Sequence, residues 1–247
     1  MTPLGHLTLL VATLAAGFGC DPSSRASTTV FASASLTEAF EALEIEFERR
    51  SGTEVDLHCA GTARLVVQLR AGATAHVLAA ADLRNMQKIV NAGLADTAPR
   101  TFAKNRLSIV MAEGNPKQVK GLRDLAREDL LVALCGPEVP AGTYARQALD
   151  KAGISLVSVS DEPSVKAIMT MVQLGEIDAG IVYETDVRSA GNTVASIVIP
   201  ERHNIVARYP VTVLSSGHAT TAGQAFVDFL MSQPGQRILQ SFGFLAP

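Results

Sequence analysis

Strand-like and helix-like segments alternate almost without interruption from Thr29 to the C-terminus. "TTVFAS" and "TEVDLHCA" read as strands, and the segment between them, from Leu36 to Arg50, has the spacing of an amphipathic helix. That spacing is set by Leu36, Ala39, Phe40, Leu43 and Phe47. Regular alternation of this kind predicts an α/β fold with mostly parallel sheets and helices on both faces. With 247 residues, of which 47% are hydrophobic, the chain can bury the core that such a fold needs.

Local signals predict where several helices begin and end. Ser35 and Glu38 have the spacing of a capping box, and Gly52 would end that first helix. Asp82 and Ser164 are expected N-caps, and Pro140 suits a first helical turn. We also expect a short helix in "GLRDLARED" and a strand in "LVSVS".

The strand–helix units fall into two groups, which predicts two lobes. Residues 27–106 form the first group and residues 107–206 the second. The segment 207–247 opens with a Tyr-Pro strand instead of a strand–helix unit, so we expect it to return to the first lobe. Two chain crossings between the lobes would then leave a cleft between them.

Residues 1–26 are expected to be a leader and linker. The first twenty residues are apolar, short for a membrane span and followed by the polar run "DPSSRASTT", as in an export signal; a buried N-terminal helix is the alternative. Small residues precede Cys20, which resembles a bacterial lipoprotein site with a lipid anchor on that cysteine. The predicted location is therefore extracytoplasmic, in the periplasm or cell envelope. There Cys59 and Cys135 can pair if they lie close enough, or serve as small core residues.

Composition and missing motifs exclude several classes of function. A net charge of −3 offers no basic surface for nucleic acid. There is no G-x-S-x-G elbow, P-loop or dinucleotide-binding glycine motif, and the five histidines are scattered singly. We therefore expect no catalytic residues, no metal-cation site, no cofactor and no enzymatic activity.

Four strand-to-helix junctions carry hydroxyl and small residues instead. They are Ser33–Leu36, Ala60–Arg64, Val139–Tyr144 and Glu162–Lys166. In open α/β sheets such junctions lie at the carboxyl ends of strands, where ligands bind. Each helix start offers free N–H groups and roughly half a positive charge, so four of them would offset roughly two negative charges. The alternative is that each junction is an ordinary helix cap.

Read together, "VFASASLTEAF", "GPEVPAGTYARQAL", "GIVYETD" and the closing "YPVTVL" resemble the periplasmic molybdate-binding proteins of bacterial ABC transporters. The resemblance covers the chain from about Thr29 onward. It implies a two-lobed, type II periplasmic-binding-protein fold hinged at two crossing strands. It also implies a monomer that binds molybdate or tungstate, through neutral donors only, and delivers it to a membrane permease.

The same resemblance implies which residues bind the ligand. Ser35 and Thr62 would donate from the first lobe, Ala141 and Val165 would donate backbone N–H groups, and Tyr183 would donate its hydroxyl. At two positions the sequence differs from the pattern that is usual in this family. Gly61 lies where a serine-rich run is usual and could shift the backbone. His76 stands where an aspartate is common.

Rival functions remain open at this point. One is a binding protein for sulfate, phosphate or an organic acid. A phosphate site needs an acceptor, and Glu138 and Glu162 are the carboxylates at the junctions' edges. Another is an enzyme on the same scaffold, for which Lys166 is the one candidate side chain; a solvated lysine on a helix face is the simpler interpretation. A regulatory domain is the third.

Overall fold

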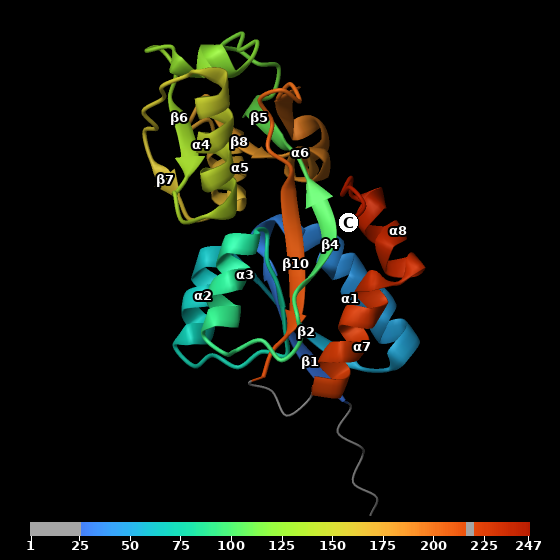
Figure 1. Cartoon of the computed structure of the whole chain (residues 1–247). Coiled ribbons are helices and arrows are strands. Elements are labelled where there is room, and N and C mark those ends of the chain that lie inside the picture. Colours follow the sequence, from blue (N-terminus) through green and yellow to red (C-terminus); the bar gives the residue numbers. More distant parts are fainter. Residues whose placement is uncertain (1–25, 216–219) are drawn as a thin grey trace, which may run out of the picture.

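The computed structural model describes residues 26–215 and 220–247 and shows two α/β lobes stacked end to end (Figure 1). Each lobe is built on a five-stranded sheet, with the strand orders β2-β1-β3-β10-β4 and β7-β6-β8-β5-β9. In the first sheet the strands are β1 (Ser27–Ser33), β2 (Glu54–Ala60), β3 (Val77–Ala79), β4 (Arg100–Asn105) and β10 (Ala207–Val213). In the second they are β5 (Leu107–Ala112), β6 (Val132–Cys135), β7 (Asp161–Glu162), β8 (Ala179–Tyr183) and β9 (Val194–Val198).

Both sheets are mixed, with as many antiparallel as parallel strand pairs, where mostly parallel sheets were expected. In the first, β1 pairs in parallel with β2 and β3, whereas β10 runs antiparallel to β3 and β4. In the second, β6 pairs in parallel with β7 and β8, whereas β5 runs antiparallel to β8 and β9. The antiparallel strands flank the places where the chain passes between lobes, at 105–107 and between β9 and β10. Figure 1 shows β4 and β10 rising side by side from the first lobe toward the second.

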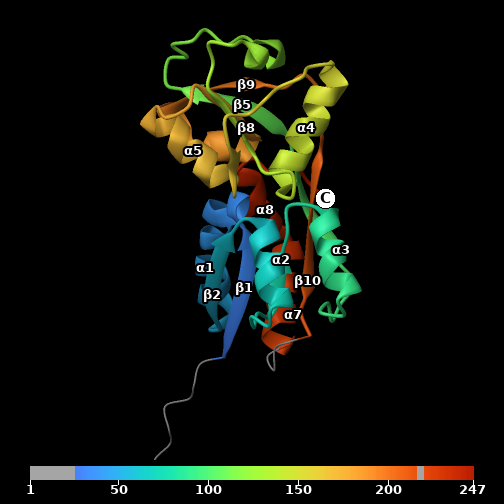
Figure 2. The same cartoon turned by 90° about the vertical axis from the view of Figure 1, so that its left-hand side faces the viewer.

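Helices cover both faces of each sheet, as the alternation predicts. The first lobe has α1 (Thr37–Ser51), α2 (Thr62–Arg70), α3 (Leu83–Asn91), α7 (Thr220–Met231) and α8 (Gln233–Ser241). The second has α4 (Pro140–Ala152), α5 (Val165–Leu174) and α6 (Glu184–Ala190). In the first lobe, α2 and α3 lie on one side of the sheet and α1, α7 and α8 on the other (Figures 1 and 2). Residues 27–105 and 207–213 thus supply one sheet and residues 107–198 the other; that 106/107 and 206/207 are domain boundaries stays a prediction.

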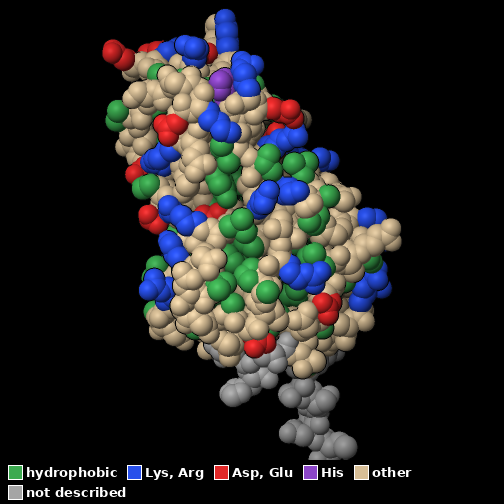
Figure 3. Space-filling model, in the orientation of Figure 1, with side chains coloured by type: hydrophobic (Ala, Val, Ile, Leu, Met, Phe, Trp, Pro, Cys, Tyr) green, Lys and Arg blue, Asp and Glu red, His purple; other side chains and the backbone are tan. Residues whose placement is uncertain are grey.

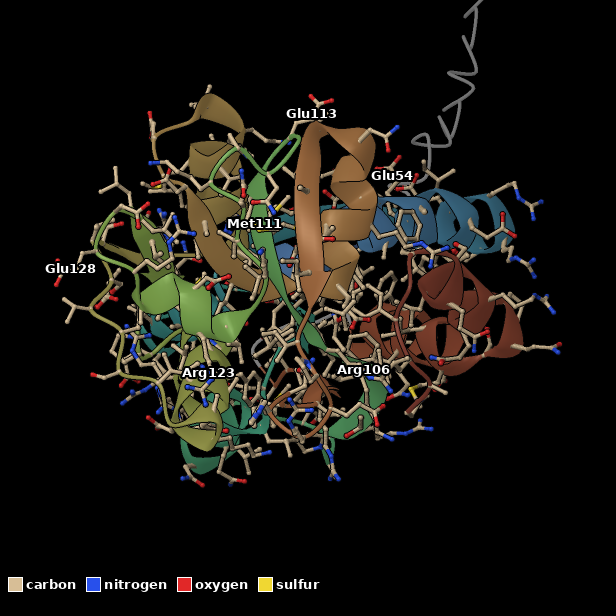
Figure 4. The ribbon with its side chains drawn as sticks, turned by 90° about the horizontal axis from the view of Figure 1, so that it is seen from above. Glu54, Arg106, Met111, Glu113, Arg123 and Glu128 are labelled. Atoms are coloured by element: carbon tan, nitrogen blue, oxygen red, sulfur yellow. The ribbon has the colours of Figure 1, made fainter. Side chains whose placement is uncertain are left out.

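Aromatic and aliphatic side chains fill the core between these layers. Phe226 on α7 packs against Phe40 and Phe47 on α1, with ring centroids 6.0 and 5.3 Å apart. In the second lobe, Met111 lies on β5 in the interior, whereas Glu113 and Glu128 point outward at the rim (Figure 4). On the face shown in Figure 3, Lys and Arg side chains are interspersed with Asp and Glu over both lobes.

Several local predictions are confirmed. Asp82 and Ser164 cap α3 and α5 by accepting the N–H groups of Asn85 and Ala167, and Pro140 is the first residue of α4. The first helix ends at Gly52, whose φ of 69° lies in the left-handed region.

Three local predictions are wrong. The capping box at Ser35 is absent, because the 3₁₀ turn η1 (Ala34–Leu36) comes before α1 and makes Leu36 the N-cap. The segment "GLRDLARED" forms only the 3₁₀ turn η2 (Leu122–Ala126). In "LVSVS", residues 159 and 160 make backbone hydrogen bonds to β6, but the regular ladder starts only at Asp161.

Candidate functional site

A small cavity lies where the two lobes meet, and the four sequence-predicted junctions converge on it. The space between atoms here, including solvent at its opening, is about 210 Å³. All five sequence-predicted residues line it: Ser35, Thr62, Ala141, Val165 and Tyr183. The rest of the lining is Ser33, Ala34, Gly61, Ala81, Val139, Pro140 and Ser164.

Helix N-termini from both lobes surround this cavity. Helix α2 begins at Thr62, α4 at Pro140 and α5 at Val165, while η1 leads from the cavity into α1. The first N–H groups of a helix have no partner within the helix, and they carry the positive end of its dipole. The cavity therefore offers several partial positive charges, and none of its lining residues is ionisable except the Tyr183 phenol.

Two glycines allow the close packing that brings these helix starts together. A Cβ atom on Gly142 would lie 2.2 Å from the carbonyl oxygens of Cys135 and Gly136, so only glycine lets α4 approach the end of β6. A Cβ atom on Gly61 would lie 2.3 Å from the carbonyl oxygen of Pro163 in the other lobe. Gly61, singled out from the sequence as a departure, is thus a point of contact between the lobes.

The Ser35 hydroxyl lies at the end of a buried row of polar side chains. Its Oγ atom is 3.0 Å from the hydroxyl of Tyr209 on β10. Tyr209 is completely buried, and its hydroxyl lies 3.4 Å from Nδ2 of Asn105 on β4. The side chain that was expected to cap α1 is therefore used at the cavity instead.

Thr62 donates its hydroxyl proton to Oγ of Ser33, 2.9 Å away, and accepts the N–H of Ala81 at 3.3 Å. In this arrangement the Thr62 proton is already used, and the Ser33 proton is the one that can point elsewhere. Sequence reasoning named the junction that contains Ser33 but not Ser33 itself. The sequence feature that could have indicated Ser33 is its position in "FASAS", two residues before Ser35 at the buried end of β1.

The hydroxyl of Tyr183 is buried, and it makes no hydrogen bond of normal length and angle with any described residue, although the neighbouring Tyr209 hydroxyl interacts with it weakly. The side chain is 1% exposed and lines the cavity, and burial raises the pKa of its phenol well above the usual value. The phenol therefore stays protonated and can act as a neutral donor. Asp186 accepts the backbone N–H of Tyr183 at 3.0 Å, which links the tyrosine to the start of α6.

Ion pairs join the lobes beside the cavity but outside its lining. Nζ of Lys166 on α5 lies 2.5 Å from Oε1 of Glu38 on α1 and 3.7 Å from Oδ1 of Asp186. Lys166 is thus an ion-paired, half-buried residue, which corrects the simpler interpretation of a solvated lysine on a helix face. At another contact, Glu138 pairs with Arg84 and Lys88 of α3.

Other sequence candidates lie away from the cavity. Nδ1 of His76 accepts the N–H of Thr29 at 2.8 Å, which ties the residue before β3 to β1. Cys59 and Cys135 are both free thiols, so the structure contains no bond between them. Cys20 lies outside the described residues. Within the described ranges, no group of three or more His, Cys, Asp or Glu side chains could hold a metal ion.

A larger hollow lies elsewhere in the second lobe. It is lined by apolar residues of β5 and β9 and by Lys120, Arg123, Arg202 and His203. It is open to solvent, and none of the four junctions reaches it. Figure 4 shows Arg123 on the outer part of this lobe. The small inter-lobe cavity therefore remains the candidate site.

Comparisons with known proteins agree with this geometry. Residues 28–245 match the family of bacterial extracellular solute-binding proteins. A molybdate-binding protein of Mycobacterium tuberculosis is 37% identical to the chain, over 100% of this chain and 97% of that protein. The periplasmic molybdate-binding protein of Azotobacter vinelandii has a TM-score of 0.80 at 19% identity, covering 89% of this chain and 99% of that one. The sulfate-binding protein of Mycobacterium tuberculosis reaches 0.76 at 18% identity, covering 89% and 86%.

At 19% and 18% identity, the two structural matches show a shared fold and nothing more. They confirm the expected periplasmic-binding-protein fold. That fold occurs with molybdate in one protein and with sulfate in the other. The 37% sequence identity over the whole chain shows membership of the same protein family. The chain belongs to the bacterial extracellular solute-binding proteins and, within them, to the family of ABC-transporter components that includes the molybdate-binding proteins.

Proposed function

We propose that the protein captures molybdate, and tungstate comparably, in the inter-lobe cavity and presents it to the permease of an ABC transporter. The observation that carries this proposal is the Tyr183 hydroxyl, a buried donor without a normal hydrogen bond to any described residue, which lines a cavity surrounded by helix N-termini. A buried donor left unpaired costs roughly 1–3 kcal/mol, which a bound acceptor would recover. The names of the relatives supply the kind of oxyanion.

The ligand-binding residues are Ser35, Thr62, Ala141, Val165 and Tyr183, to which we add Ser33. Ala141 and Val165 would act through their backbone N–H groups at the starts of α4 and α5. All of these groups are neutral donors, and Thr62 would donate through its backbone N–H at the start of α2, because its hydroxyl proton is already given to Ser33. A dianion that accepts hydrogen bonds at every oxygen fits them without a positively charged side chain.

The absence of a carboxylate from the cavity lining argues against phosphate. Hydrogen phosphate carries a proton near neutral pH and needs a carboxylate or another acceptor to receive it. Neither Glu138 nor Glu162 lines the cavity, and Glu138 is turned toward Arg84 and Lys88. Sulfate is the stronger rival, because it is also a tetrahedral dianion and the same fold serves a sulfate-binding protein. Discrimination between sulfate and molybdate would have to come from cavity size.

An enzymatic role receives no support from this site. Lys166 lies outside the cavity lining and is held by two carboxylates, and the lining contains no residue that could act as a base for Ser33 or Ser35. We therefore propose binding without catalysis and without a cofactor, by a monomer that does not engage nucleic acid. We further propose that residues 1–26 direct export and that lipid on Cys20 anchors the protein outside the cytoplasm. Within the described ranges, no helix is both long and apolar enough to cross a membrane.

Calorimetric titration of the protein with molybdate, tungstate, sulfate and phosphate tests the ligand. We expect molybdate and tungstate to bind comparably and both to bind more tightly than sulfate. Tighter binding of sulfate would overturn the assignment. Native mass spectrometry of protein purified from its own host gives a second check, through the mass of any oxyanion that remains bound.

A further inference from the structure

A buried row of four polar side chains runs from the crossing strands to the cavity. It consists of Thr185 at the start of α6, Asn105 at the end of β4, Tyr209 on β10 and Ser35 in η1, all at most 4% exposed. Nδ2 of Asn105 donates to Oγ1 of Thr185 at 2.8 Å and faces the Tyr209 hydroxyl at 3.4 Å. The Tyr209 hydroxyl is 3.0 Å from Oγ of Ser35.

The orientation of the Asn105 amide follows from its neighbour in the chain. The backbone N–H of Arg106 donates to Oδ1 of Asn105 at 2.9 Å. If the amide were reversed, its NH₂ group would face this N–H and two donors would oppose each other. Nδ2 therefore faces Thr185 and Tyr209, and toward both it can only donate.

This orientation decides which way the next proton points. The Tyr209 phenol cannot donate to Nδ2 of Asn105, because an amide nitrogen is not an acceptor. The Tyr183 hydroxyl also lies near enough to influence the pKa of Tyr209, but it makes no hydrogen bond of normal length and angle with any described residue. The acceptor left at hydrogen-bonding distance is therefore Oγ of Ser35. Tyr209 thus donates to Ser35, and burial, which raises the pKa of Tyr209, keeps the proton in place. Having accepted this bond, Ser35 has its own proton free for the cavity that it lines.

We propose that Asn105 and Tyr209 are positioning residues that fix the Ser35 hydroxyl as a donor toward the cavity and so favour a fully deprotonated oxyanion. This inference rests on the proposed oxyanion site. A serine hydroxyl that rotates freely can donate to one ligand and accept from another. A serine whose oxygen already accepts from Tyr209 is a better donor and a poorer acceptor, so it discriminates against a ligand that brings its own proton.

A double-mutant cycle between Tyr209 and Ser35 tests the inference. We expect Tyr209→Phe to weaken molybdate binding about tenfold, measured by calorimetry. In the Ser35→Ala background the same change should cost less than about twofold, because the hydroxyl that it orients is already gone. Thr212→Val is the control, since it removes another buried hydroxyl of β10, one that donates to the Thr97 carbonyl and lies outside the cavity lining. An equal loss in both backgrounds would mean that Tyr209 acts through general damage, and the inference would be wrong.

Asn105→Asp is a second variant, which should reverse the direction of the hydrogen bond between Tyr209 and Ser35. A carboxylate only accepts, so the Tyr209 proton would turn toward it and Ser35 would donate to Tyr209 instead of to the ligand. The new negative charge weakens anion binding in any background. The loss should therefore be at least about fivefold greater with Ser35 present than with Ser35→Ala, and equal losses would contradict the proposal.

Proton NMR of the ligand-free protein separates this inference from the proposed function. We expect an exchange-protected Tyr209 hydroxyl proton with a cross-peak to the Ser35 β protons. A protected Ser35 hydroxyl proton directed at the Tyr209 oxygen would overturn the inference whatever the ligand is. If the wild-type protein failed to bind molybdate, the proposed function would fail, and the NMR result would still decide the direction of these protons.

Discussion

Nζ of Lys166 on α5 lies 2.5 Å from Oε1 of Glu38 on α1, so that this ion pair joins the second lobe to the first beside the cavity. The same ammonium group is 3.7 Å from Oδ1 of Asp186 in its own lobe. When the lobes separate, Glu38 must leave Lys166, whereas Asp186 can stay with it. The Lys166–Glu38 contact therefore requires the two lobes to lie together as they do in this structure.

The first prediction concerns this contact. Glu38→Gln should raise the dissociation constant for molybdate about two- to fivefold, because a partly exposed ion pair contributes roughly 0.2–1 kcal/mol. The change should appear mainly as faster dissociation, measured by stopped-flow release, and should shrink at high salt. Glu41→Gln is the control, since it removes the same charge one turn further along the exposed side of α1. Identical kinetics for the two variants would count against a role for Glu38 in closure.

The second prediction concerns Gly61. Gly61→Ala should weaken molybdate binding by more than tenfold, because the added methyl group would overlap the Pro163 carbonyl of the other lobe and hold the lobes apart. Small-angle X-ray scattering with excess ligand should show a more open molecule than the wild type. Gly121→Ala serves as the control, because a Cβ atom there meets nothing within 4 Å. A variant that closes and binds normally would show that the lobes need not approach this closely.

The third prediction separates stability from binding at Tyr183. Tyr183→Phe removes a buried hydroxyl that makes no normal hydrogen bond with any described residue, so the ligand-free protein should become more stable by about 1 kcal/mol in urea unfolding. The same change should weaken molybdate binding about tenfold, because a donor to the ligand is lost. A loss of stability together with unchanged affinity would place the Tyr183 hydroxyl outside the binding site.

The fourth prediction is a pH dependence from Asp186. Burial raises the pKa of this carboxyl from 3.8 to about 7, and Glu38 adds to the shift, while Lys166 and the Tyr183 N–H oppose it. Between these two values the folded protein holds a proton that the unfolded chain has released, so the free energy of unfolding falls as pH rises from about 4 to about 7.

Asp186→Asn should remove this fall, which we expect to be roughly 2–4 kcal/mol. Urea unfolding of both proteins across this pH range measures it. A wild-type profile that runs parallel to that of the variant would show that Asp186 is ionised in the fold throughout.

The sequence was sufficient to predict the alternating fold, which follows from local patterns. The resemblance to the molybdate-binding proteins supplied five of the residues that line the cavity. The sequence was insufficient where the outcome depends on contacts between distant segments. The spacing of Ser35 and Glu38 predicted a helix cap at Ser35. In the structure, η1 moves the start of α1 to Thr37, and the Ser35 hydroxyl is hydrogen-bonded to Tyr209, 174 residues away. Ser33 and the pairing of Lys166 with Glu38 were missed for the same reason: both depend on partners that are distant in sequence.

Two of the proposed donors, at Ala141 and Val165, are peptide N–H groups at the starts of α4 and α5. Every amino acid except proline carries such a group, so point mutations at these two codons leave the donor itself in place as long as the new side chain fits. Related chains can then differ at both positions and still take up the same nutrient. To find proteins with the same binding site in other genomes, one should compare the backbone geometry at these two positions instead of the identity of the residues.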